Sequence, residues 1–251
     1  MAVIGWKYQT TLQDRHKRFS LPLTSSSVMM LNTFGGSGLI VSGHEEIMEI
    51  ELKYRIPDEE VAARIWEDSL FSEIEEDDSR KEINMYAIYY DTAELDLARN
   101  KIAYRVRRED DRLIATLKWR GKSEDGLHVR EELTVPVTES DPDIEVFLES
   151  DIGSELEQLI SEKEMVELMH TDMRRRRFRI DTGKGIYEIS VDEGSVSAGG
   201  ESTPVREVEI ELFSGETEEL VEIGRRMQEV YGLEPEDTSK YAKGIELICH
   251  R

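Results

Sequence analysis

Charged residues recur at every second position in several short segments, and their types suit a metal ion and a phosphate. Glu49, Glu51 and Lys53 are each separated by one residue, and the segment 207–211 repeats glutamate at the same spacing. Carboxylates two positions apart on a strand lie side by side, which suits a hard cation such as Mg²⁺ or Mn²⁺. These two segments therefore predict carboxylate metal ligands.

Arginines take the same alternate positions in the segments that lie between these two. Arginine is always charged and presents a planar fork of donors that fits phosphate oxygens. The arginines concerned are Arg105, Arg107, Arg130, Arg175, Arg177 and Arg179. Metal-assisted phosphoryl transfer needs both kinds of group, so the combination predicts chemistry on a phosphorylated ligand.

The alternation requires β-strands, because successive side chains of a strand point to opposite faces. Strands are predicted at 48–56, 84–91, 102–108, 113–119, 129–135, 174–181, 186–192 and 207–213, and helices at about 58–70, 154–168, 216–231 and 239–247. We find no parallel βαβ rhythm. The pattern favours an α+β fold, in which an eight-stranded antiparallel β-barrel closes around the charged faces and helices pack outside.

An open antiparallel sheet with its charged face in water is the alternative, and it is the usual explanation for a single strand of this kind. Against it, acids gather on the first and last strands while arginines gather on the strands between them. A closed lumen with such walls would need an anion for its arginines and cations for its carboxylates. We therefore expect the charged faces to form a ligand-binding tunnel.

Composition limits the partners of the chain. With 251 residues and a net charge of -23, the chain is a poor candidate for binding long nucleic acid, and it has no apolar run of membrane-spanning length. The single cysteine, Cys249, fits a reducing compartment and predicts a cytoplasmic location. Residues 1–45 are rich in Ser, Thr and Gly and are predicted to be a disordered N-terminal extension, with one domain over 46–251.

The segment 49–53 resembles the ExExK signature of the CYTH superfamily, also called triphosphate tunnel metalloenzymes. That superfamily includes inorganic tripolyphosphatases, thiamine triphosphatase, class IV adenylate cyclases and fungal RNA triphosphatases. Further segments are similar to family motifs in the same order, namely Tyr89–Thr92, Tyr104–Arg107, Thr116–Lys118, Val129–Glu132 and Ser239–Tyr241. The resemblance covers about residues 46–248.

The resemblance implies an eight-stranded tunnel and a dependence on Mg²⁺ or Mn²⁺. It assigns metal ligation to Glu49, Glu51, Glu209 and Glu211, although Glu207 with Glu209 is an alternative C-terminal pair. It assigns phosphate binding to Lys53, Arg105, Arg107, Lys118, Arg130, Arg177, Arg179 and Lys240. Glu132 and Asp192 would position water or a second metal and, with Glu49, Glu51 and Lys53, make up the expected catalytic set. Arg175 is expected at the rim.

Two motif residues are predicted to be structural. Asp91 is expected to cap the end of its strand, and Glu188 is expected to balance a neighbouring arginine. Neither prediction requires contact with a ligand.

The expected function is hydrolysis of a small triphosphate, with inorganic tripolyphosphate as the substrate and water as the nucleophile. One alternative is a class IV-type adenylate cyclase, in which the ribose 3′-hydroxyl replaces water. The other is a non-catalytic protein that binds polyphosphate or nucleotides. The resemblance allows a homodimer, and no membrane or long nucleic-acid partner is expected.

Overall fold

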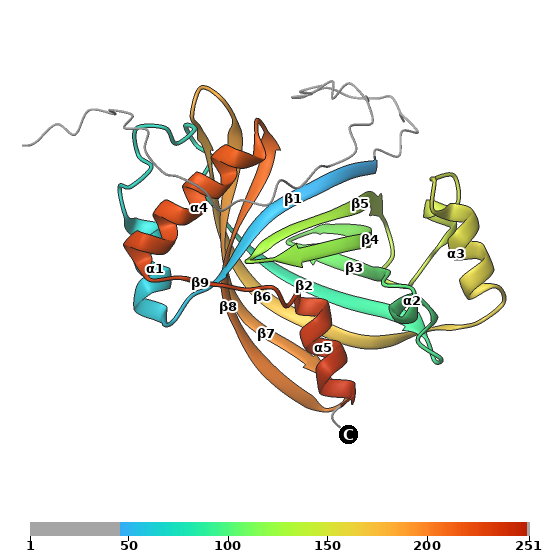
Figure 1. Cartoon of the computed structure of the whole chain (residues 1–251). Helices are drawn as coiled ribbons and strands as arrows, with labels where there is room; N and C mark the ends of the chain where they lie inside the picture. Colours follow the sequence, from blue (N-terminus) through green and yellow to red (C-terminus); the bar gives the residue numbers. More distant parts are fainter. Residues whose placement is uncertain (1–45, 250–251) are drawn as a thin grey trace, which may run out of the picture. The chain divides into compact units, whose positions relative to one another are not determined.

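The structure, a computed structural model, describes residues 46–249, and antiparallel strands of this part of the chain close into a barrel (Figure 1). The strands are β1 (Glu46–Arg55), β2 (Lys81–Thr92), β3 (Ala103–Glu109), β4 (Arg112–Glu124), β5 (Leu127–Val137), β6 (Met165–Asp181), β7 (Ile186–Ala198) and β8 (Glu201–Ser214). Their order is β5-β4-β3-β2-β6-β7-β8-β1, and a pairing between β1 and β5 closes it. The predicted α+β fold with a closed eight-stranded barrel is confirmed.

The strand register shows which residues face the inside of the barrel. Glu49 pairs with Arg130 on β5, and Lys53 pairs with Glu209 on β8. Directly paired residues project to the same face of a sheet, so each pairing carries the charged face on to the next strand. The charged alternation predicted from the sequence therefore points inward. A ninth short strand, β9 (Glu234–Pro235), pairs with the other end of β1.

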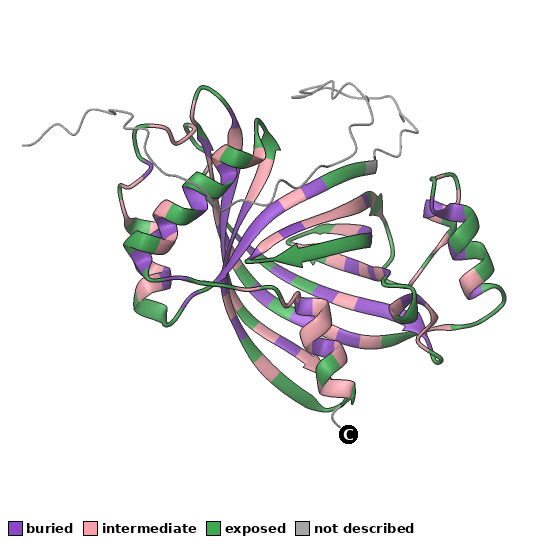
Figure 2. Ribbon diagram, viewed as in Figure 1, coloured by how far each residue is buried: buried purple, intermediate pink, exposed green. Residues whose placement is uncertain are grey.

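Helices cover the apolar outer faces of the strands in two separate places. Helices α1 (Glu59–Glu67) and α4 (Thr217–Tyr231) pack over β1, β6, β7 and β8, where Leu52, Ile189 and Ile210 are buried. Helix α3 (Gly153–Ile160), with the short helices α2 (Asp96–Arg99) and η1 (Glu145–Phe147), covers β3, β4 and β5 around Leu117 and Leu133. Figure 2 shows buried residues alternating with more exposed ones along these strands. Burial of the outer face thus fixes the register that turns the charges inward.

The last helix, α5 (Lys240–Cys249), packs differently from the other helices. It lies against Met169, Val196 and Ala198, which belong to the inward-facing set of β6 and β7. Gly244 permits this approach, since a Cβ there would stand 2.1 Å from the sulfur of Met169. The first turn of α5 consequently reaches the interior of the barrel.

The predicted helix at 154–168 is too long. Helix α3 ends at Ile160, where Ser161 takes a left-handed φ of 51°, and β6 already begins at Met165. Pairing of residues 165–167 with Tyr90–Thr92 of β2 overrides the local helical pattern. The two short helices α2 and η1 were not predicted, because one turn gives no recognisable period.

Asp91 has the structural role that the sequence predicts. It is completely buried, and its carboxylate accepts hydrogen bonds from the backbone N–H groups of Thr92, Leu97 and Ala98 at 2.7–2.9 Å. These bonds cap the start of α2 and fix the turn after β2.

The predicted disordered extension at 1–45 lies outside the described residues. Within residues 46–249, no helix is long and apolar enough to cross a membrane.

Replacing Gly194 with alanine should destabilise the barrel. A Cβ at this position would stand 2.0 Å from the backbone oxygen of Asp172 on the neighbouring strand, so β6 and β7 would have to separate. We expect a loss of about 2–3 kcal/mol in the free energy of unfolding, measured by urea denaturation. Gly183→Ala is the control, because its Cβ meets open space and only its φ of +79° opposes the change, by about 1 kcal/mol. Equal losses in the two variants would contradict the close approach of the strands.

Candidate functional site

The interior of the barrel holds a cavity of about 640 Å³. Its walls come from the inner faces of the strands and from the first turns of α5. Most of the predicted site residues line it, namely Glu49, Glu51, Lys53, Arg105, Arg107, Lys118, Arg130, Glu132, Arg177, Glu209, Glu211 and Lys240. Arg179 and Asp192 do not line it. One cavity thus gathers residues from across 192 positions of the sequence, from Glu49 to Lys240.

Glu49 and Glu51 are buried carboxylates held by two cations from neighbouring strands. Lys118 Nζ lies 2.8 Å from Glu49, and Arg130 donates to Glu51 at 2.7 Å while also contacting Glu49. Burial alone would raise the pKa of Glu49, but Lys118 and Arg130 hold this pKa well below its usual range. Both acids therefore stand in the cavity as partnered carboxylates.

Glu211 lies beside these two acids and has no cation of its own. It pairs with Glu51 in the register of β1 and β8, and its side chain forms no hydrogen bond or ion pair with any residue of the range 46–249. Burial, followed by repulsion from Glu49 and Glu51, raises the pKa of Glu211 to about 8. Three neighbouring carboxylates, one of which has no ion-pair partner, are a donor set that fits a hard divalent ion.

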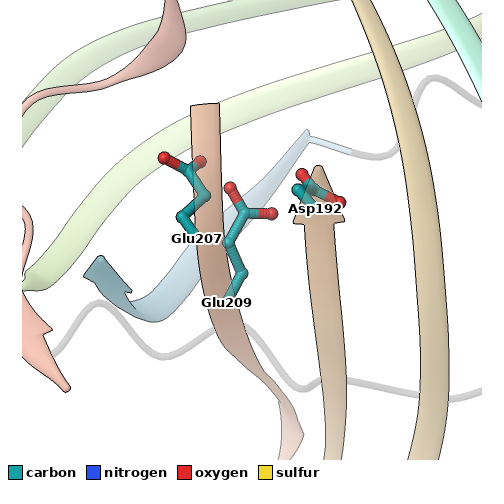
Figure 3. A group of neighbouring side chains, drawn as sticks. All are labelled: Asp192, Glu207 and Glu209. Carbon is teal, nitrogen blue, oxygen red and sulfur yellow. The ribbon is translucent and has the colours of Figure 1, made fainter. Parts of the chain in front are cut away.

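A second acidic cluster lies deeper in the barrel. Asp192 of β7 and Glu207 and Glu209 of β8 bring carboxylate oxygens within 4.8 Å of one another (Figure 3). Lys240 contacts all three at 2.5–2.9 Å, and Lys53 lies 3.0 Å from Glu209. Because these cations already neutralise the cluster, it is a weaker candidate for a metal ion than the group around Glu211.

The glutamates of β8 thus differ in their surroundings although their spacing is uniform. Glu207 and Glu209 hold the ammonium groups of Lys53 and Lys240. Glu211 is instead repelled by Glu49 and Glu51 more strongly than it is attracted by Lys118. Burial opposes ionisation of Glu209, but Lys240, Lys53 and Arg175 hold its pKa well below its usual range. Sequence spacing alone could not separate these environments.

Arg105 and Arg107 are the predicted phosphate-binding residues of the cavity whose guanidinium groups keep an unpaired donor. Arg105 reaches only the hydroxyl of Tyr89, at 3.5 Å, and Arg107 contacts Glu109 at 2.5 Å. The Nε of each is buried without a hydrogen-bond partner. Burial and then repulsion from Arg105 lower the pKa of Arg107 to about 10. Such a pair attracts an anion, because a buried guanidinium needs acceptors for its donors.

Arg175 lies in the cavity wall, so its expected position at the rim is wrong. It donates to both carboxylate oxygens of Asp192 at 2.7 Å and contacts Glu209. The expectation failed because β6 begins at Met165, which places Arg175 in the middle of the strand. Arg179 is the residue nearer the rim, with its side chain 42% exposed and stacked over the ring of Phe213.

Glu188 balances arginines, as the sequence predicts. Its carboxylate accepts from Arg177 at 3.0 Å and from Arg179 at 3.2 Å. The two arginines are thereby held side by side on β6.

Several residues of the cavity wall were not predicted. Ile83, Met85 and Tyr89 give β2 an apolar inner face, and Tyr89 stacks on Tyr241 of α5 with ring centroids 5.5 Å apart. Charge alternation could not reveal this wall, because β2 has no charged stripe. Its inward residues could be found only from the pairing of β2 with β3 and β6.

A comparison with protein families settles the relationship of the chain. The model of the CYTH domain matches residues 48–245. The chain belongs to the CYTH domain family. An inorganic triphosphatase from Haemophilus influenzae is 33% identical to the CYTH chain over 132 residues. That match covers 53% of this chain and 37% of the relative, so the chain spans well under half of the length of that protein.

Solved structures share the CYTH fold of the chain. An adenylyl cyclase homologue from Hippeastrum, described as having a dominant triphosphatase activity, superposes with a TM-score of 0.58 at 22% identity, covering 79% of this chain and 96% of that one. A protein from Pyrococcus horikoshii superposes with a TM-score of 0.51 at 20% identity, covering 79% and 98%. At these identities the likeness concerns the fold.

Without metal, Glu211→Gln should become more stable relative to the wild type as the pH rises from about 5 to about 9. Because the pKa of Glu211 rises from 4.5 to about 8 in the folded state, the folded protein keeps a proton that the unfolded chain has lost. The free energy of unfolding of the wild type therefore falls across this range. We expect the difference in this free energy between Glu211→Gln and the wild type to change by about 2–4 kcal/mol between the two pH values. Thermal denaturation in a chelating buffer at both pH values measures it.

The exposed substitution Glu162→Gln is the control and should show no pH-dependent difference. A difference for Glu211→Gln that stays constant with pH would argue against the raised pKa.

Proposed function

We propose that this CYTH chain hydrolyses a small triphosphate, that inorganic tripolyphosphate is its preferred substrate, and that Mg²⁺ or Mn²⁺ is its cofactor. One observation carries the proposal. A single cavity sets the neighbouring acids Glu49, Glu51 and Glu211, the last without an ion-pair partner, together with two arginines. The buried Nε donors of these arginines, Arg105 and Arg107, lack acceptors. A metal ion with a polyphosphate would satisfy both groups at once.

Glu49, Glu51 and Glu211 would hold the metal ion, and Glu209 would support them from the neighbouring position on β8. A divalent ion bound there would polarise a phosphoryl oxygen and lower the pKa of a water molecule. The same ion would relieve the repulsion that now keeps Glu211 protonated near neutral pH.

Arg105 and Arg107 would bind the phosphates first, because each has a buried Nε donor without an acceptor. Lys118 and Arg130 are tied to Glu49 and Glu51, so they would turn to phosphate oxygens as the acids turn to the metal. Arg177 and Arg179 would add positive charge at the end of the cavity where β6 approaches Phe213. Lys53 and Lys240, which are buried among acids, would act mainly through these acids.

Glu132 is the best-placed group for orienting the attacking water. It lines the cavity, contacts Lys118 and accepts a hydrogen bond from Thr134 at 2.9 Å. Asp192 is completely buried, and both of its oxygens are already bonded to Arg175 or Lys240. We therefore assign Asp192 the role of positioning these two cations.

The names of two similar proteins support this proposal. The Haemophilus influenzae relative bears the name of an inorganic triphosphatase, and the Hippeastrum protein is described by its triphosphatase activity. A cytoplasmic location and a homodimer stay predictions.

Purified protein with Mg²⁺ or Mn²⁺ should release phosphate from tripolyphosphate faster than from ATP or thiamine triphosphate. Glu51→Gln should lower this rate by at least about 100-fold, because the change removes one charged ligand of the metal. Phosphate release, assayed colorimetrically with and without a chelator, measures both effects. Glu131→Gln is the matched control on β5, since its side chain pairs with Arg120 rather than lining the cavity.

Two results would contradict the proposal. Full activity of Glu51→Gln would contradict the assignment of Glu51 as a ligand of the metal ion. Formation of cyclic AMP from ATP faster than release of phosphate would favour the cyclase, whereas tight binding of tripolyphosphate without turnover would favour a binding protein.

Arg105→Met should weaken the binding of tripolyphosphate by about 10- to 100-fold, because the variant loses a charged donor that has no carboxylate partner. The effect should appear mainly in KM, measured with initial rates across substrate concentrations. Arg174→Met is the control, since Arg174 pairs with Glu193 and does not line the cavity. Equal KM values for the two variants would show that Arg105 does not bind the phosphates of the substrate.

A further inference from the structure

Glu109 is an acid of the cavity wall that no motif predicted and that the proposed chemistry does not use. It is the last residue of β3, and it follows Arg105 and Arg107 on the inward face at the same spacing of two. The row of expected phosphate-binding cations on this strand therefore ends in a carboxylate. Such an acid opposes the binding of an anion, so its position needs an explanation.

Glu109 forms an ion pair with Arg107 and with no other side chain of residues 46–249. Arg107 Nη2 lies 2.5 Å from Glu109 Oε1. Burial and repulsion from Arg105 and Arg175 lower the pKa of Arg107, whereas attraction to Glu109 acts in the opposite direction. Glu109 thus serves as the counter-ion of Arg107 in this arrangement.

A phosphoryl group that binds Arg107 has to displace this carboxylate. Carboxylate and phosphate oxygens accept hydrogen bonds from the same planar set of guanidinium donors. The buried Nε of Arg107 lacks an acceptor, but the Nη2 side is taken by Glu109. Once displaced, Glu109 would be an acid beside a polyanion, and the repulsion would weaken binding unless another cation received the carboxylate.

Arg112 is the cation in position to receive Glu109. It is the residue of β4 that pairs directly with Glu109 in the register of β3 and β4. Side chains of directly paired residues project to the same face with Cβ atoms about 4.5–5.5 Å apart, so opposite charges there can form an ion pair. Arg112 is exposed, does not line the cavity, and forms no ion pair with any side chain of residues 46–249. Its charge is therefore available to a displaced Glu109.

We propose that Glu109 is a displaceable counter-ion, which leaves Arg107 for Arg112 when a polyphosphate binds. Arg112 is then a positioning residue, which sets the affinity of the cavity through Glu109 without contacting the ligand. The proposal rests on the proposed function for the identity of the anion that Arg107 receives. Arg107 is paired with Glu109 before binding, and Glu109 is paired with Arg112 after it, so neither charge is left without a partner.

Calorimetry with tripolyphosphate tests the exchange on the full-length protein in EDTA, which removes the metal ions that the proposed hydrolysis needs. Glu109→Gln keeps an oxygen that accepts from Arg107 but removes the competing charge, so its Kd should fall about three- to ten-fold. Arg112→Met leaves the displaced Glu109 without a partner, so its Kd should rise about three- to five-fold. Added to Glu109→Gln, the change Arg112→Met should alter Kd by less than about two-fold.

Arg108→Met is the matched control, because Arg108 is an exposed arginine at the same end of β3 and does not line the cavity. A rise in Kd for this control equal to that of Arg112→Met would show an effect of overall charge and would overturn the proposal. The proposal also fails if Glu109→Gln binds tripolyphosphate no more tightly than the wild type. Equal effects of Arg112→Met with and without Glu109 would refute the exchange as well.

These binding outcomes do not depend on turnover. A wild-type protein that releases no phosphate from tripolyphosphate with Mg²⁺ or Mn²⁺ refutes the proposed hydrolysis, whereas the Kd values decide on Glu109 and Arg112. The two failures are therefore distinguishable.

Discussion

Closure of β1 onto β5 removes a large set of charged side chains from water, and each of them must then find an opposite charge inside the barrel. A buried charge without a partner costs several kcal/mol, which is a large part of the net stability of a domain. Most of these side chains form ion pairs between different strands, such as Lys118 with Glu49 and Arg175 with Asp192. The polar interior is thus a network whose geometry is set by the sheet register, and the apolar outer faces set that register in turn.

Where the pairing is incomplete, the interior has capacity for a ligand. Glu211 lacks a cation, and the Nε donors of Arg105 and Arg107 lack acceptors. These deficits have opposite sign and lie in one cavity, so a divalent cation bound together with a polyanion can resolve both. The lysines buried among Asp192, Glu207 and Glu209 have no such deficit, and this part of the interior serves as a fixed support.

The sequence predicted the barrel and most of its charged lining because both follow from a two-residue period. Charged stripes on β1, β3, β6 and β8 are visible without any knowledge of pairing. The apolar inner face of β2 was missed, since the inward direction of Met85 depends on its neighbours across the sheet. The position of Arg175 was misjudged because the start of β6 is hidden by a helix-like pattern at 161–168. The contrast between Glu209 and Glu211 depends on which cations approach, and Lys240 arrives from a helix at the far end of the chain.

The packing of α5 against the inward-facing residues of β6 and β7 has a consequence for the order in which the molecule is completed. Ribosomes make the chain from its N-terminus, so β1, β7 and β8 all emerge before Lys240 exists. Until then, Asp192, Glu207 and Glu209 lack the ammonium group that contacts all three, and closing the barrel around them would be unfavourable. Packing of α5 therefore adds a third cation to Lys53 and Arg175, which already contact these acids from β1 and β6. Closure of this domain is in this respect governed by pairings distant in sequence rather than by local ones.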